Sequence, residues 1–368
     1  MVLVKAKRDA LLTPLSAVSG IIERRHTLPI LSNVLIERSA GSLAYLATDI
    51  EIQITARGPV DTSGEARAVT VGARKLVDIL RALPEEAEVT LQHQDKRLLL
   101  KAGKSRFVLQ TLPAEDFPRL AKPVGDVARF SLPQKALRRL LVLVQYAMAQ
   151  QDIRYYLNGL LMVVEDRVLK LIATDGHRLA FASMALEAQL PRQEVIVPRK
   201  TVIELAKLLT DGEAEVMIEL SGTQATFAFG TVELVSKLVD GKFPDYTRVI
   251  PVGHKNKLAI NREVLRQALL RAAILSNEKF RGVRWVLTDG SLKIVSSNTE
   301  QEEAEETIEV DYSGDALDIG FNVNYLLDVL NNVSGSEVEC RFGDASSSAL
   351  LSFPSEADFK YVVMPMRI

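Results

Sequence analysis

The sequence predicts an α+β protein made of three consecutive copies of one domain. The main observation is a repeat: Ala-Thr-Asp at 47–49 recurs at 173–175, and Ser-Ser-Asn follows at 296–298. The first two strings lie 126 residues apart (47 to 173), which is the length of a whole domain and too long for a solenoid unit. The second observation is that each copy carries two helical patterns among many short β-rich runs.

Other anchors keep the same spacing along the chain. Val-Gly-Ala-Arg-Lys at 71–75 is matched by Val-Pro-Arg-Lys at 197–200 and by Phe-Asn-Val-Asn-Tyr at 321–325. Asp-Phe-Pro at 116–118 is matched by Lys-Phe-Pro-Asp at 242–245. Turn-rich segments near 121–126 and 251–256 separate the copies. The predicted domains are therefore 1–125, 126–252 and 253–368.

Helical periodicity and start signals predict two helices in each copy. Ser131 and Pro133, Pro198 and Asn261 are start signals before the third, fourth and fifth helices. Alternating runs bounded by Gly and Asp predict about eight short strands per copy, packed as antiparallel sheets under the helices. The predicted helices span 6–18, 73–82, 134–147, 199–209, 262–275 and 323–332.

Composition limits the class of protein. With 47% hydrophobic and 25% charged residues in 368, each copy can bury an ordinary core. Charges at Lys5, Lys7 and Arg8 interrupt the first apolar run, so no signal peptide is expected, and no apolar stretch is long enough to span a membrane. Cys340 is the only cysteine, which fits a reducing cytoplasm.

The net charge of −2 conceals an uneven distribution. The six helical windows carry 14 Lys or Arg against five Asp or Glu, a net charge of +9, while the rest carries 31 against 42, or −11. One interpretation is that basic side chains fill solvated helix faces. The other is that the helices share a basic surface for a polyanion while the strands form an acidic exterior.

Two motifs resemble catalytic elements. Gly103-Lys104-Ser105 resembles the end of a phosphate-binding loop, but that loop needs a Gly where Leu98 stands, so a hairpin turn is expected. Asp-Gly-His-Arg at 175–178 could supply an acid–base pair, but the Asp-Gly pair also fits a tight turn between two strands. None of the four histidines has metal-ligand spacing, and no nucleophile elbow occurs. No catalytic residue, metal or cofactor is therefore expected.

The ends of the repeat array carry opposite charges. The segment 101–106 is basic and 301–306 is acidic, so two chains can join head to tail, with Ile274 and Leu275 as an apolar centre or as core residues. Six helices about 10 Å apart enclose a bore of about 9 Å, whereas twelve enclose about 28 Å, which admits duplex DNA. This arithmetic favours two chains per ring. The Met-Pro-Met segment at 364–366 suits either a final buried strand or an adaptable partner groove.

Five long strings give the sequence a close resemblance to the beta subunits of bacterial DNA polymerase III, the sliding clamps. They lie at 151–159 (QDIRYYLNG), 173–180 (ATDGHRLA), 236–246 (SKLVDGKFPDY), 273–279 (AILSNEK) and 364–367 (MPMR). The departures are Thr299, where the family often has Pro, and Ile368, where it ends in Leu. The resemblance implies three processivity-fold (DNA clamp) domains forming half of a closed ring.

The resemblance also implies a non-catalytic clamp that encircles duplex DNA without sequence preference and tethers the polymerase. The implied partners are a second copy, the polymerase III alpha subunit, the clamp-loader delta subunit and other polymerases or repair proteins that carry short clamp-binding peptides. Carried over by position, the DNA contacts are Arg25, Arg74, Gln151, Tyr155 and Tyr156. The peptide groove is Leu157, Thr174, Gly176, His177, Arg178, Leu179, Pro244, Arg248, Val249, Ser348, Val362, Met364, Pro365, Met366 and Arg367. The seam is Lys104, Arg106, Phe107 and Leu109 against Ile274, Leu275, Glu300, Glu302 and Glu303.

Two alternatives remain open at this stage. A hydrolase would need Asp175 and His177 in one concave site with a nucleophile, and the sequence offers no candidate for that nucleophile. A binder of single-stranded DNA would need aromatic residues distributed along a groove, but Tyr155 and Tyr156 are the only adjacent aromatic pair.

Overall fold

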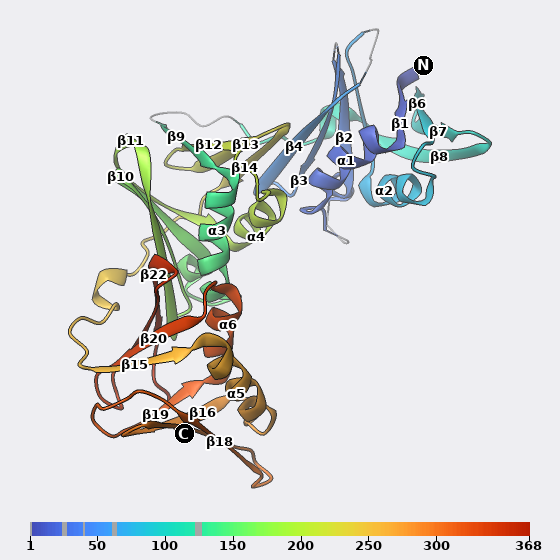
Figure 1. Ribbon diagram of the computed structural model, residues 1–368. Coiled ribbons are helices and arrows are strands. Elements are labelled where there is room, and N and C mark those ends of the chain that lie inside the picture. The colour runs from blue at the N-terminus through green and yellow to red at the C-terminus, as the bar shows by residue number, and fades with distance from the viewer. Residues whose placement is uncertain (1, 24–27, 40, 61–64, 122–126) are drawn as a thin grey trace. The chain divides into compact units, whose positions relative to one another are not determined.

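The computed structural model describes residues 2–23, 28–39, 41–60, 65–121 and 127–368 (Figure 1). Its six α-helices coincide with the six predicted windows to within three residues at each end. The third helix ends earlier than predicted because its last turn tightens into a 3-10 turn, Gln145–Ala147. The helices are α1 (Arg8–Ser19), α2 (Ala73–Ala82), α3 (Gln134–Val144), α4 (Arg199–Leu208), α5 (Arg262–Ile274) and α6 (Val323–Asn332).

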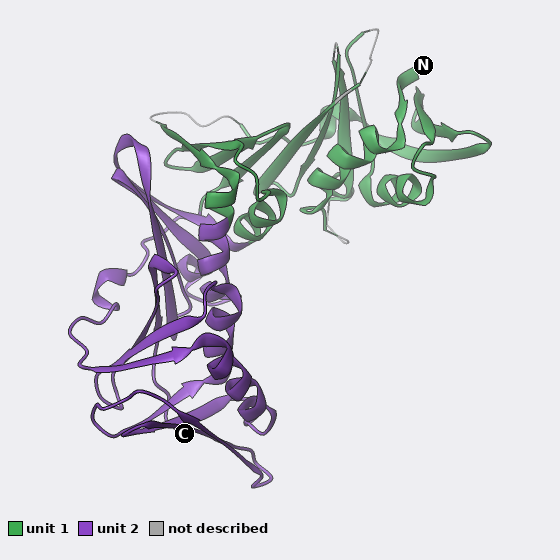
Figure 2. Cartoon of the chain, viewed as in Figure 1, with its two compact units in different colours: residues 1–138, 200–238 green, residues 139–199, 239–368 purple. Residues whose placement is uncertain are grey.

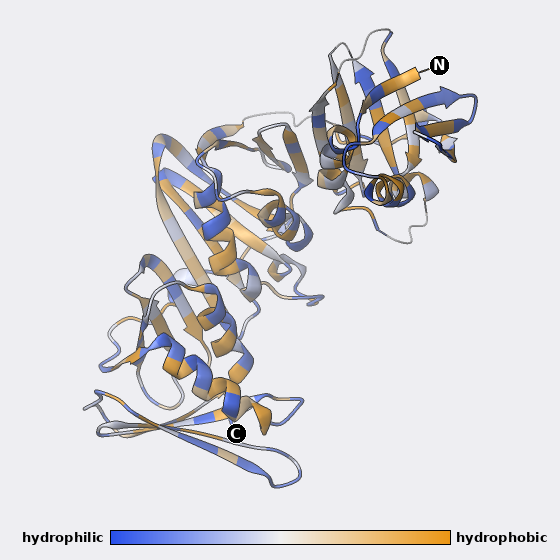
Figure 3. Cartoon of the chain, turned by 45° about the vertical axis from the view of Figure 1, so that its right-hand side comes forward, coloured by the Kyte–Doolittle hydropathy of each residue, from blue (hydrophilic) through white to orange (hydrophobic). Residues whose placement is uncertain are grey.

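The helices form because their apolar residues recur at helical spacing and because two starts are capped. Figure 3 shows this spacing as blue and orange bands along each helix. On α2, Leu76 and Leu80 are buried while Arg81 is exposed. At α5, the Asn261 side chain accepts from two backbone N–H groups of the first turn, as its position predicted, and Asn322 does the same for one N–H of α6.

The chain divides into two compact units, residues 1–138 with 200–238 and residues 139–199 with 239–368 (Figure 2). Among the described residues, the first unit holds one twelve-stranded antiparallel sheet in the order β1-β6-β7-β8-β5-β2-β3-β4-β14-β13-β12-β9. Its strands are β1 (Val2–Lys7), β2 (Asn33–Ser39), β3 (Ser42–Thr48), β4 (Ile52–Pro59), β5 (Arg67–Gly72), β6 (Glu88–Gln94), β7 (Arg97–Ala102), β8 (Ser105–Leu112), β9 (Ala128–Pro133), β12 (Glu215–Leu220), β13 (Gln224–Phe229) and β14 (Val232–Lys237).

The second unit holds a six-stranded sheet, β10-β11-β22-β21-β20-β15, and a four-stranded sheet, β18-β17-β16-β19. Trp285, Phe321 and Phe342 pack edge-on in its core, at centroid distances of 5.5 and 6.2 Å from the indole. The strands are β10 (Gly159–Thr174), β11 (Arg178–Pro198), β15 (Asn256–Asn261), β16 (Gly282–Thr288), β17 (Ser291–Ser297), β18 (Glu303–Glu309), β19 (Leu317–Asn322), β20 (Glu337–Phe342), β21 (Ala349–Phe353) and β22 (Glu356–Val363).

The described strands number eight in the first and third repeats but six in the second, where eight were predicted. The difference arises because β10 and β11 run continuously where the first repeat has the pairs β2–β3 and β4–β5. The pairing register of β10 with β11 shifts on both sides of Asp166, which has a positive φ of 53°. The second repeat therefore bends its strands where the first repeat interrupts them.

The repeats are joined by the same pairing each time. The fourth strand of repeat one, β4, pairs with the last strand of repeat two, β14, and β11 of repeat two pairs with β22 of repeat three. Residues 122–126 of the expected first linker lie outside the described part of the chain.

Candidate binding surfaces

An apolar groove lies in the second unit, beside the pairing of β11 with β22. A cavity of about 190 Å³ opens there. Leu157 and Leu179 are buried in the cluster beneath it, together with Phe243 and Val362. The cavity wall is therefore part of a packed core, which preforms the groove. The lining residues are Arg154, Leu157, Thr174, Gly176, Leu179, Phe243, Pro244, Tyr246, Val249 and Met364.

The turn at 174–178 forms one end of this groove and matches the predicted Asp-Gly turn. The Asp175 carboxylate accepts from the backbone N–H groups of His177 at 2.9 Å and Arg178 at 3.0 Å. Gly176 has φ of +88°, a conformation that favours glycine. The carboxylate thus bonds to the backbone of the turn and to the Arg178 side chain, and in the described part of the chain it makes no bond to the His177 imidazole. This geometry supports a structural turn and offers no acid–base pair.

The Arg178 side chain is buried and does not line the cavity. It is 9% exposed and donates to Asp328 at 2.5 Å, to the Tyr146 carbonyl at 2.7 Å and to Asp175 at 3.2 Å. Its guanidinium carbon lies 4.5 Å from the centroid of the Tyr325 ring. These contacts connect the turn with helix α6.

The predicted groove residues other than Arg178 fall into four groups. Leu157, Thr174, Gly176, Leu179, Pro244, Val249 and Met364 line the cavity, whereas Val362 is buried below it. Others lie nearby without lining it: His177 is exposed on the turn, Arg248 pairs with Asp245 at 3.0 Å, and Ser348 is half-buried before β21. The last residues leave the groove, since the Met366 N–H donates to the Gly320 carbonyl at 2.9 Å; Pro365 and Arg367 flank that contact.

Sequence reasoning missed three lining residues: Arg154, Phe243 and Tyr246. All three lie inside the strings that carried the family resemblance, at 151–159 and 236–246. Tyr246 stacks on Phe181 with centroids 6.0 Å apart, and burial raises the pKa of its phenol. Their position inside those strings was the sequence signal that could have identified them as groove residues.

Three of the predicted DNA contacts, Gln151, Tyr155 and Tyr156, lie in a short loop and the 3-10 turn Tyr155–Leu157 that follows it. Arg154 of the same loop lines the groove. Arg154 forms side-chain and backbone bonds to Asp152, which hold the pKa of that carboxyl at about 2. Gln151 has a positive φ of 55°, and Tyr155 is 58% exposed in an edge-to-face pair with Tyr156. The exposed ring and amide are available to a ligand.

The other predicted DNA contacts belong to the first unit. Arg74 is exposed on α2 and lines a cavity of about 480 Å³ between α1 and α2, together with Arg81, Ser16 and Ser19. Arg25 lies outside the described residues. Several helix cations counted in the sequence are paired with acids in loops or strands, as in Lys135 with Glu213 and Arg271 with Glu306.

The predicted seam residues lie on β8 and its hairpin turn, and around the end of α5 and the start of β18. On β8, Arg106 is exposed while Phe107 and Leu109 are half-buried, and Lys104 lies in the hairpin turn where Gly103 has φ of +57°. That hairpin confirms the prediction made against a phosphate loop. The opposing set lies in the second unit: Ile274 is 76% exposed, Leu275 is half-buried, and Glu300, Glu302 and Glu303 are exposed at the start of β18.

No helix in the described part of the chain is long and apolar enough to cross a membrane.

Comparison with known proteins gives matches along nearly the whole chain. Models of the DNA polymerase III beta subunit match as its N-terminal domain at residues 3–121, its central domain at 131–245 and its C-terminal domain at 247–367. A beta sliding clamp of Pseudomonas putida is 49% identical, and the match covers 98% of this chain and 99% of that protein.

Solved structures agree with the sequence matches. The DNA polymerase III subunit beta of Pseudomonas aeruginosa has a TM-score of 0.95 at 47% identity, covering 99% of this chain and 100% of that one. The Caulobacter crescentus pol III beta has a TM-score of 0.93 at 38% identity, with 99% of both chains covered. The three repeats, the sheets and these matches agree: the chain belongs to the DNA polymerase III beta subunits, the beta sliding clamps, which are non-catalytic processivity factors of that polymerase.

Proposed function

We propose that two copies of this chain join head to tail into a ring that encircles duplex DNA and tethers the replicative polymerase. The main support for a ring is the strand pairing between consecutive repeats. β4 of repeat one pairs with β14, the last strand of repeat two, and the first part of β11, which corresponds to β4, pairs with β22, the last strand of repeat three. By the same rule, β18 of repeat three requires the last strand of a first repeat, which is β8.

Both strands have an open edge for this pairing. β18 is the outermost strand of the four-stranded sheet. From Ser105 to Gln110, β8 pairs only with β7, since its pairing with β5 is confined to Thr111 and Leu112. An open edge of this length is a template for another strand, and a second copy supplies the complementary one.

Charge favours the same pairing. β18 exposes Glu303, Glu305 and Glu309, whereas the β8 edge and its turn expose Arg106 and Lys104. Opposite charges across the pair steer two copies together and disfavour pairing of two β18 edges. Domain boundaries near residues 125 and 252 would then give six similar domains around the ring.

We propose that the duplex is held by many weak phosphate contacts. Arg74 and Arg81, which line the α1–α2 cavity, are candidates, and so are Gln151, Tyr155 and Tyr156. Arg25, outside the described residues, is a candidate by its position in the sequence. Such contacts position DNA without reading its sequence. Ion pairs neutralise other helix cations and so weaken the binding of the protein to DNA. Weak binding allows the protein to slide, and the closed ring then keeps it on the DNA. This role places the protein in the cytoplasm.

We propose that the groove binds short peptides carrying a Gln and a Leu-Phe pair. The candidate partners are the polymerase III alpha subunit, the clamp-loader delta subunit and other polymerases or repair proteins. The preformed apolar cavity would take the Leu and Phe side chains. The Nε and Nη2 of Arg154 donate to Asp152 and to the Asp175 carbonyl, which leaves Nη1 to meet a side-chain carbonyl of the peptide.

The groove is tested with Met364→Ala, measured by polarisation of a labelled peptide of this kind. Truncating a half-buried lining side chain removes about 2 kcal/mol of apolar contact, so Kd should rise about thirtyfold. The matched control is Met217→Ala, which truncates a methionine that is 44% exposed on β12, outside the groove. Equal peptide affinity in the two variants would place the site elsewhere.

A further inference from the structure

We infer that Asp328 on α6 is a positioning residue for the peptide groove and acts through Arg178. This inference rests on the peptide-binding function proposed above. Asp328 does not line the cavity. It accepts from the Nη1 of Arg178 at 2.5 Å, and Arg178 begins strand β11 directly after the turn that forms one end of the groove.

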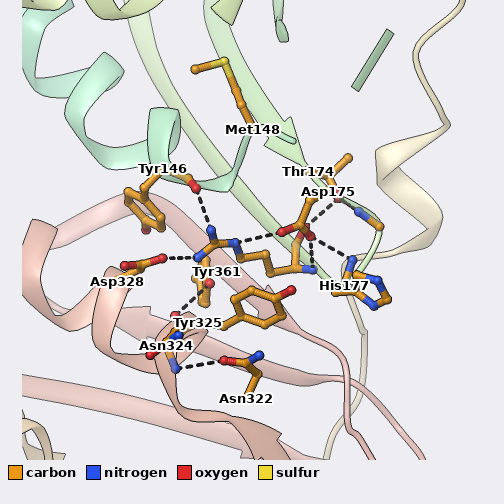
Figure 4. A network of polar contacts seen from close by, with 12 residues as sticks. Tyr146, Met148, Thr174, Asp175, His177, Asn322, Asn324, Tyr325, Asp328 and Tyr361 are labelled. Carbon is orange, nitrogen blue, oxygen red and sulfur yellow. Dashed lines mark hydrogen bonds and ion pairs between the residues drawn. The ribbon is translucent and has the colours of Figure 1, made fainter. Parts of the chain in front are cut away.

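The guanidinium of Arg178 contacts residues that do not line the cavity. It is shared among Asp328, the Tyr146 carbonyl and Asp175, and it lies over the ring of Tyr325 (Figure 4). Asp328 is the acid on a separate helix in this set. It therefore ties the turn to α6, whereas the Asp175 carboxylate bonds to His177 and Arg178 within the turn.

Asp175 links the Arg178 side chain to the backbone of the turn beside the groove. One carboxylate oxygen of Asp175 accepts from Arg178 Nε, and the other accepts from the N–H groups of His177 and Arg178. The Thr174 hydroxyl donates to the Arg178 carbonyl and accepts from the Gly176 N–H at 3.1 Å. Thr174 and Gly176 both line the cavity, so a shift of Arg178 moves the cavity wall.

The same contacts orient two further groups at the rim. The His177 ring stacks on Tyr325 at 6.5 Å with an interplanar angle of 18°. The His177 carbonyl accepts from the Met364 N–H at 2.8 Å, which fixes the other wall of the groove. Without Asp328, a guanidinium that is 9% exposed loses one of its two counter-charges and must seek water. The turn would then sample positions unsuited to the peptide.

The chain offers a matched control at the same helix position in the preceding repeat. Glu204 on α4 corresponds to Asp328 on α6, since both are the sixth residue of their helices. Glu204 is bonded to Lys207 of its own helix and belongs to the first unit. Removing it deletes an acid at the equivalent helix position that does not line the cavity.

The experiment measures Kd of full-length variants for a labelled peptide carrying a Gln and a Leu-Phe pair. Asp328→Ala should raise Kd about tenfold, as expected when about one molecule in ten keeps a competent turn. Asp328→Asn should weaken binding in the same direction, and Asp328→Glu should restore it to within about twofold, because Glu keeps the charge that Arg178 requires. Glu204→Ala should bind as the unaltered protein does. If Asp328→Ala does not fold by circular dichroism, the Asn and Glu variants decide.

Rescue by Glu but not by Asn would support the positioning role, since mere loss of packing would affect both. Unchanged Kd in Asp328→Ala or Asp328→Asn, with binding lost in Met364→Ala, would overturn the inference and leave the proposed groove standing. An equal loss in Glu204→Ala would also overturn it. If Met364→Ala binds normally as well, the proposed groove itself is wrong.

Discussion

The exposed isoleucine at the end of α5 allows a quantitative prediction about the seam. Ile274 is 76% exposed in the single chain, and the proposed pairing of β18 with β8 would cover it. Ile274→Ala removes three carbon groups, worth about 0.8 kcal/mol each when buried. Scaled by the 76% of the surface available for burial, the loss is about 1.8 kcal/mol per seam.

A head-to-tail dimer has two such seams, so the loss doubles to about 3.6 kcal/mol, or on the order of 400-fold in the dimer dissociation constant. Adding Leu275→Ala should leave mostly monomers at micromolar concentration. The assay is sedimentation velocity or native mass spectrometry over a dilution series.

The matched control is Ile153→Ala. This isoleucine is 96% exposed, lies in the loop beside Tyr155 and is not one of the predicted seam residues. The control should keep the dissociation constant of the unaltered protein. An Ile274→Ala variant that dimerises as tightly as Ile153→Ala would show that the seam does not bury Ile274.

Two further predictions concern charge. Arg74→Ala should flatten the slope of log K for direct DNA binding against log salt by about one unit, because one phosphate contact is lost; an unchanged slope in a salt titration would remove Arg74 from the DNA surface. The carboxyl of Asp152 should titrate at about 2 in an NMR pH titration, and Arg154→Ala should move it back toward 3.8. Because the folded pKa is lowered, the Asp152–Arg154 contact stabilises the loop above roughly pH 4 and is lost as pH falls toward 2; a normal midpoint would refute the pairing.

The fold could be predicted from sequence because the repeat and the helix signals are local. Asn261 caps α5 as expected, and the Gly103 hairpin forms where the phosphate-loop pattern failed. The continuous strands β10 and β11 could not be predicted, since the bend near Asp166 depends on pairing between distant residues. Polar residues interrupt the apolar pattern of both segments, and such interruptions predict separate short strands.

The candidate surfaces were only partly accessible to sequence reasoning. The Asp-Gly turn at 175–176 was predicted, but the direction of the Arg178 side chain depends on Asp328, 150 residues away. The charge count identified basic helices but not their partners, because pairs such as Lys135 with Glu213 form only in three dimensions. Arg154 was missed as a groove residue although it lies inside the string at 151–159.

The central claim is that a closed ring, and not strong binding, retains this protein on DNA. The most direct test loads the protein on a nicked circular duplex and washes it with high salt, which weakens phosphate contacts but does not open a ring. Protein should remain on the circle and should leave after a single cut converts the circle to a linear duplex. Equal retention on linear and circular DNA in high salt would contradict the account.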